Sequence, residues 1–92
     1  MVAQSIKDWA SGYNEEALLA DGLDDAFIGM CHVWRDHQRV NVAAYDVEKC
    51  IEALMREDMS HEEAEEYFSF NIEGAYMGEA TPVWLYPFRP DA

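Results

Sequence analysis

Two segments in the second half of the chain carry apolar residues at helical spacing. The first stripe recurs at i, i+3, i+4, i+7 and i+8 and comprises Val47, Cys50, Ile51, Leu54 and Met55. Asp46 stands directly before it, and aspartate is a favoured N-cap residue. The pattern therefore predicts a helix that begins after Asp46 and buries this stripe.

The second helix is marked by its start. Ser60 and Glu63 have the S-x-x-E spacing of a capping box, in which each side chain accepts a hydrogen bond from the other residue's backbone N–H. Its predicted buried stripe is Ala64, Tyr67, Phe68 and Ile72, and Gly74 is a suitable end. Residues 57–59 alone separate the two helices, which predicts a tight corner.

The first half and the tail contain shorter apolar runs. Residues 27–34 and 40–45 are rich in aromatic and β-branched residues, and the polar residues 35–39 between them predict a β-hairpin. Residues 17–20, closed by the turn dipeptide Asp21-Gly22, predict a short strand. Residues 81–88 have proline near both ends, which predicts an edge strand. Ile6 and Trp9 indicate a short helix that stops near Gly12.

These elements predict one α+β domain over residues 1–92. The expected architecture is a small antiparallel sheet of three or four strands with the two consecutive helices packed on one face. A chain of this mass buries roughly 64% of its unfolded surface, which is enough for one modest core.

The charge of the chain is unusual. Nineteen acids oppose six Lys and Arg, giving a net charge of −13, whereas a small soluble domain typically carries about 2 to 8. Direct binding to nucleic acid is disfavoured, because it needs Lys and Arg against phosphates. Two interpretations stay open: the charge attracts a partner with a basic surface, or it only maintains solubility.

The acids concentrate in one part of the chain. Residues 57–79 contain eight acids and no Lys or Arg. Phe70 lies off the predicted stripe of the second helix, so we expect it at the surface, where an exposed aromatic marks a protein contact. The candidate partner-binding residues are Glu57, Asp58, Glu62, Glu63, Glu65, Glu66, Glu73 and Phe70. Tyr86 and Phe88 lie on the predicted C-terminal edge strand, through which a homodimer is possible.

The sequence offers little for catalysis or cofactors. Cys31, His32, His37 and Cys50 are zinc-ligand types, but their spacing fits no common zinc pattern. No nucleophile elbow, P-loop or H-E-x-x-H motif is present. We therefore expect no enzyme activity, no metal and no cofactor. Two cysteines without a disulfide framework favour a reduced compartment. We also expect neither a membrane span nor a secretory signal.

Three segments carry a family resemblance. They read DVEKCIEAL from residue 46, MSHEEAEEYFSFN from residue 59 and GAYMGEATP from residue 74, and DGLDDA at 21–26 adds to them. The chain over residues 45 to 84 resembles a family of small acidic proteins encoded by bacteriophages. The resemblance implies viral origin and the host-cell cytoplasm, and it assigns no reaction and no catalytic residue.

The sequence as a whole predicts a small non-enzymatic phage protein that binds a host protein. In the preferred hypothesis its acids occupy a basic nucleic-acid-binding surface, as an anti-CRISPR or anti-restriction inhibitor that imitates DNA. The alternative is a dimeric accessory interaction protein of a phage that mimics no nucleic acid.

Overall fold

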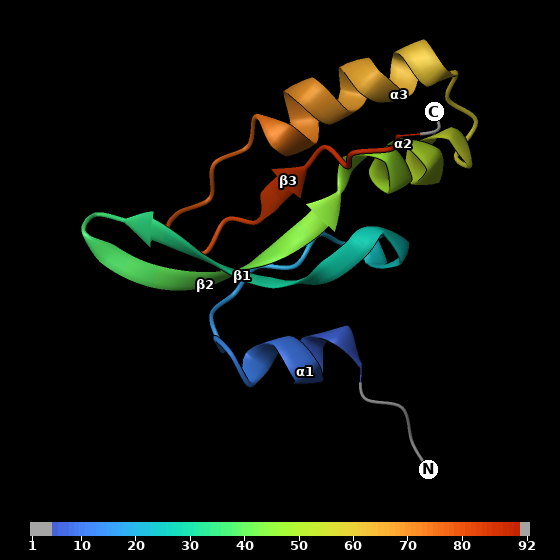
Figure 1. Ribbon diagram of the computed structural model, residues 1–92. Coiled ribbons are helices and arrows are strands. Elements are labelled where there is room, and N and C mark those ends of the chain that lie inside the picture. Colours follow the sequence, from blue (N-terminus) through green and yellow to red (C-terminus); the bar gives the residue numbers. More distant parts are fainter. Residues whose placement is uncertain (1–4, 91–92) are drawn as a thin grey trace.

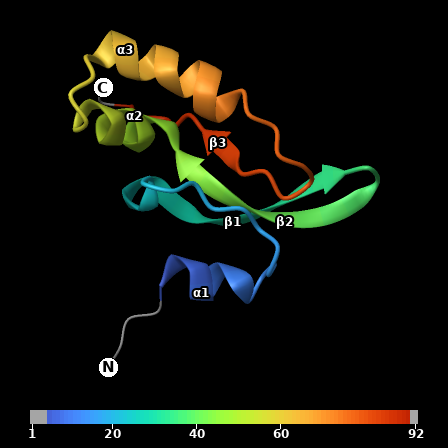
Figure 2. The same ribbon diagram turned by 180° about the vertical axis from the view of Figure 1, so that it is seen from behind.

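The computed structural model describes residues 5–90. The elements run in the order α1 (Ile6–Ser11), the 3₁₀ turn η1 (Asp24–Ala26), β1 (Phe27–Arg35), β2 (Gln38–Asp46), α2 (Val47–Met55), α3 (His61–Tyr67), the π-helical segment η2 (Phe68–Glu73) and β3 (Val83–Leu85). Figure 1 shows α2 and α3 on one side of the sheet and α1 on the other, and Figure 2 shows the same layers from behind. The predicted α+β class, with two consecutive helices on one face, is confirmed.

The first two strands form the predicted hairpin. β1 and β2 are antiparallel, and Arg35 stands opposite Gln38. The turn holds only Asp36 and His37, with φ values of 50° and 66°. Two positive φ values are the signature of a type I′ turn, whose twist matches that of the strands it joins. The loop is shorter than expected, because both strands continue into the polar segment.

The third strand runs parallel to its neighbour. The sheet order is β1-β2-β3, and β3 pairs with β2 from Ala44↔Val83 to Asp46↔Leu85. The expected antiparallel sheet therefore holds only for β1 and β2. The reason is the connection: α2 and α3 lie between β2 and β3, and such a helical crossover returns the chain in the same direction. The prediction of a C-terminal edge strand is confirmed over Val83–Leu85.

The strand predicted at residues 17–20 is wrong. This segment is irregular, and it is held by isolated hydrogen bonds. The Leu18 N–H donates to the Ala80 carbonyl at 3.3 Å, and the Ala20 N–H donates to the Tyr45 hydroxyl at 2.8 Å. The short apolar run predicts a strand, but its apolar character has another reason, because Leu19 and Ala20 pack against the core. The Asp21-Gly22 turn is confirmed, and Gly22 adopts a φ of 80°.

The core lies between the sheet and the two consecutive helices. Four of the five predicted α2 residues are buried, namely Val47, Cys50, Ile51 and Leu54. Phe68 is only 2% exposed, and its ring meets that of Trp84 edge-on at 5.4 Å between centroids. Trp84 also contacts Tyr45 at 5.3 Å. Trp84 of β3 thus covers one side of the core with its indole ring.

Two residues assigned to the buried stripes are at the surface. Met55 ends α2 and Tyr67 is 43% exposed. The core contacts come from Ala64 in α3 and from Phe68, which is the first residue of η2 and lies four residues later, so Tyr67 falls on the flank of that stripe. Gly74 follows the last residue of η2 as its C-cap, and a Cβ atom there would lie 3.0 Å from the Ser69 carbonyl oxygen. Only glycine avoids that contact.

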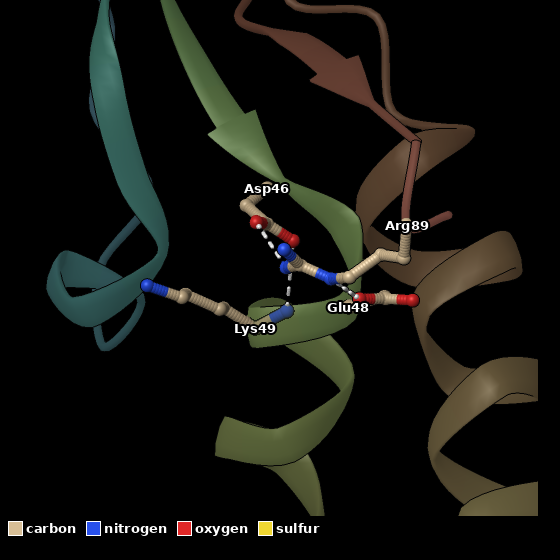
Figure 3. A network of polar contacts seen from close by, with 4 residues as sticks. All are labelled: Asp46, Glu48, Lys49 and Arg89. Atoms are coloured by element: carbon tan, nitrogen blue, oxygen red, sulfur yellow. Dashed lines mark hydrogen bonds and ion pairs between the residues drawn. The ribbon is translucent and has the colours of Figure 1, made fainter. Parts of the chain in front are cut away.

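The chain after β3 returns to the start of α2 (Figure 3). The Arg89 guanidinium donates from Nε to Glu48 Oε2 at 2.6 Å and from Nη2 to Asp46 Oδ2 at 3.2 Å. Asp46 also caps α2 as predicted, because its Oδ1 accepts from the Lys49 N–H at 3.1 Å. The Asp46 carboxylate therefore caps α2 and also binds the C-terminal segment through Arg89.

Candidate functional site

The predicted capping box fixes the first turn of α3. The Ser60 hydroxyl accepts from the Glu63 N–H at 3.1 Å, and Glu63 Oε1 accepts from the Ser60 N–H at 2.9 Å. The hydrogen bond that the Ser60 backbone N–H donates to the Glu63 carboxyl lowers the pKa of that carboxyl, and the Ser60 side chain lowers it further. Glu63 is thus a charged structural residue at the helix start, and its free oxygen still faces solvent.

All eight predicted partner-binding residues are exposed. They are Glu57, Asp58, Glu62, Glu63, Glu65, Glu66, Glu73 and Phe70. Within the part of the chain that the structure describes, the side chains of Glu57, Asp58, Glu62 and Glu66 make no hydrogen bond or ion pair. These four carboxylates are available to a cationic partner without the loss of an internal contact.

Two of the acids have weak partners of their own. Glu65 Oε1 lies 3.3 Å from His61 Nδ1, one turn earlier on α3. Glu73 Oε2 accepts a hydrogen bond from the Tyr86 hydroxyl at 2.9 Å, which raises the pKa of Tyr86. Contacts between exposed groups of this kind contribute little to stability. A cation from another protein can therefore replace them at small cost.

A shallow groove of about 360 Å³ lies along α3 and the start of η2. We call it the α3 groove, and its lining residues are Met59, Glu63, Glu66, Tyr67, Phe70 and Asn71. Phe70 is 78% exposed, which confirms that it lies off the buried stripe. The groove places two carboxylates beside two aromatic rings. Lys and Arg side chains bind such rings by cation–π contacts and such carboxylates by charge-assisted hydrogen bonds.

The structure brings three of the predicted residues together in this groove and leaves the others outside it. Glu63, Glu66 and Phe70 line it, whereas Glu62 and Glu65 project elsewhere from α3. Sequence reasoning missed Met59, Tyr67 and Asn71. A signal for the groove did exist, because Met59, Glu63, Glu66 and Phe70 recur at i, i+4, i+7 and i+11. This exposed stripe shares one helical segment with the buried stripe of Ala64 and Phe68.

The residues considered for metal binding lie apart. Within residues 5–90, no three His, Cys, Asp or Glu side chains come together as ligands would. The imidazole of His32 contacts the Asn41 side chain, and His37 lies in the hairpin turn. Cys50 is buried, and desolvation raises the pKa of its thiol to about 11. Burial also raises the pKa of Cys31.

None of the helices in the described part of the chain is long and apolar enough to cross a membrane.

Comparisons of the chain with protein-family models, with curated proteins and with solved structures give no match. The resemblance to a bacteriophage family thus stays a prediction from the residues quoted above.

Proposed function

We propose that this protein binds a host protein through the exposed acids of α3 and so blocks a basic nucleic-acid-binding surface. We call these acids, Glu62, Glu63, Glu65 and Glu66, the acidic face of α3. The observation that carries the proposal is the set of exposed carboxylates on α3, beside a groove with two exposed aromatic rings. In its most concrete form, the proposal is a phage-encoded anti-CRISPR or anti-restriction inhibitor that acts in the host cytoplasm.

The charge density on α3 supports mimicry of DNA. Glu62, Glu63, Glu65 and Glu66 place four acids within five residues. At 1.5 Å per residue they span about 6 Å of helix axis, so successive charges are on average about 2 Å apart along it. Duplex DNA carries one charge per about 1.7 Å of its axis. A basic channel built for phosphates thus meets a similar charge density over one helical turn.

A second candidate function is a dimeric accessory interaction protein whose charge serves only solubility. The exposed aromatic residues Tyr86 and Phe88, next to the β3 edge, favour it. In that case contacts would be apolar, and partner binding would be insensitive to the acids on α3. The two proposals therefore differ in the effect of charge reversal.

The experiment compares two quadruple variants of the full chain. One changes Glu57, Glu62, Glu65 and Glu66 to Lys and spares Glu63, because Glu63 caps the helix. The matched control changes the exposed residues Asp8, Glu15, Glu16 and Asp21 to Lys. Both changes add eight charge units to −13 and give a net charge of −5. Only the position of the added charge differs.

Wild-type protein, immobilised, should capture a nucleic-acid-binding protein from bacterial host lysate and should compete with nucleic acid for it. The control variant should behave in the same way, and the α3 variant should lose both capture and competition. Equal losses in the two variants would show that only net charge matters. Full binding by the α3 variant would remove α3 from the proposal and favour the second candidate function.

A further inference from the structure

The outer edge of β1 is an unprotected strand edge. Eight of its nine residues pair with β2, on one side only, and the ninth, Ile28, forms a β-bulge between Phe27 and Gly29. The strand contains no Pro, Lys, Asp or Glu, the residues that usually prevent edges from pairing, and its one charged side chain is Arg35. The edge of β3 is different, because it spans three residues between Pro82 and Pro87.

The hairpin geometry shows which backbone groups point outward along β1. The Asn41 carbonyl accepts a hydrogen bond from the Asn14 side chain at 2.9 Å, so it points away from β1. Its antiparallel partner His32 therefore directs its own N–H and C=O away from β2. With the alternation along a strand, Met30 and Trp34 do the same. Among the described residues these groups have no backbone partner outside the sheet.

The charge of the hairpin differs from that of the rest of the chain. Residues 27–45 contain Arg35, Arg39 and Asp36, so their net charge is +1, and the other 73 residues then carry −14. Two copies of this protein repel each other over most of their surfaces. The hairpin is the surface at which a second copy can approach without that repulsion.

We infer that two copies pair through antiparallel β1 edges, which joins two three-stranded sheets into one sheet of six strands. In the register that we propose, Cys31 stands opposite Cys31 of the second copy on the two-fold axis, and Gly29 to Val33, which lie in the regular part of β1, pair with the same residues of the second copy. Met30 of each copy then exchanges backbone hydrogen bonds with His32 of the other. This inference is independent of the function proposed for α3.

Side chains and charge support this register. Ile28 (52% exposed) lies at the β-bulge on the α1 side of the sheet, and Trp34 (72% exposed) lies on the other face, so a second copy paired at this edge covers part of one apolar side chain on each face. The acidic pair Asp24 and Asp25 before β1 lies near the second copy's residues 35–39, which carry +1. A parallel arrangement would instead place like charges together.

An apolar groove of about 530 Å³ extends the contact on the α1 side of the sheet. It is lined in part by Trp9, Ile28, Gly29 and Cys31. In the proposed register Val33 of the second copy stands opposite Gly29, where this chain has no side chain to fill the space. Pairing thus adds apolar contacts to the backbone hydrogen bonds.

The first test is the solution mass of the full chain by light scattering and sedimentation. We expect a dimer of twice the 10.6 kDa chain mass. His32→Pro removes an outward N–H and leaves the ladder to β2 intact, and Trp34→Glu places a negative charge on the edge that pairs. Both variants should be monomers at a concentration where wild type is dimeric. Leu85→Glu, which alters a 51% exposed residue on the β3 edge, should remain dimeric. Thermal unfolding of each variant verifies that it is folded.

The second test is oxidative crosslinking. Facing residues that share no hydrogen bonds have Cα atoms about 4.5 Å apart, and a disulfide accepts about 4.4 to 6.8 Å. Mild oxidation should therefore link Cys31 to Cys31 and leave the buried Cys50 unlinked. Cys31→Ser should abolish the crosslink and keep the dimer mass. A monomeric wild type, or a dimer that survives both His32→Pro and Trp34→Glu and is lost in Leu85→Glu, would overturn the inference.

Discussion

Phe68 and Phe70 lie two residues apart on one helical segment, and alanine substitutions at the two positions should have opposite outcomes. Phe68 is 2% exposed and contacts Trp84 edge-on, whereas Phe70 is 78% exposed in the α3 groove. Phe68→Ala removes a buried ring and leaves a cavity, which costs about 3 to 5 kcal/mol of unfolding free energy. Phe70→Ala should change it by no more than about 0.5 kcal/mol.

The loss at Phe68 is large for a chain of this size. Ninety-two residues correspond to a total stability of about 5 to 14 kcal/mol. For such a domain each kcal/mol lowers Tm by about 4 to 8 °C. Thermal unfolding followed by circular dichroism should therefore show Phe68→Ala at least about 12 °C below wild type and Phe70→Ala close to it. If both variants melt like wild type, or both melt early, the assignment of faces on η2 is wrong.

Three further predictions concern local contacts and pH. Ser60→Ala should lower the unfolding free energy by about 1 kcal/mol, measured by urea titration, because it removes the α3 cap. Because its pKa is lowered in the folded state, the Glu63 carboxylate stabilises the fold at neutral pH, and this stabilisation is lost as pH falls through that pKa. Glu63→Gln can still cap α3, and thermal melts below pH 5 should show that its stability depends less on pH than that of wild type. Burial raises the Cys50 pKa from 9.0 to about 11, so stability should fall by about 2 to 3 kcal/mol as pH rises from 9 to 11. That loss should be smaller in Cys50→Ala, and an equal loss would contradict the assignment.

Local signals were sufficient for most of the fold. Asp46 and the Ser60–Glu63 pair mark helix starts, because a cap depends on a few neighbouring residues. The direction of β3 was not predictable in the same way. It depends on how the chain returns from α3 to the sheet, and the tripeptide Val83–Leu85 has the same pattern in either direction.

The candidate site shows a similar division. The exposed acids and Phe70 were predictable, because they lie off the buried stripe of α3. The α3 groove was not predictable, because Tyr67 lies at the boundary between the buried and exposed faces. The helical spacing predicts it on the buried face, whereas in the structure it is exposed and lines the groove. The segment at 17–20 failed for a related reason. Its apolar residues pack on the core without a strand edge to pair with, and composition alone does not distinguish these cases.

The two proposed associations respond to salt with opposite signs. Binding of a basic partner to α3 is an attraction between unlike charges and should weaken as salt rises. Pairing of two β1 edges brings together copies of net charge −13, so added salt should strengthen it by screening their repulsion. Partner binding and dimerisation can therefore be separated in one salt series, even if both occur in the same sample.

The most direct test of the central claim is the affinity for the captured host protein as a function of salt. It is measured by calorimetry for wild type and for the two quadruple variants. We predict that wild-type Kd rises with salt, that the control variant retains most of the affinity and the salt dependence, and that the α3 variant shows no binding at any salt concentration. A salt-independent Kd for wild type, or an α3 variant that binds as wild type does, would contradict the claim that the acidic face of α3 makes the contact.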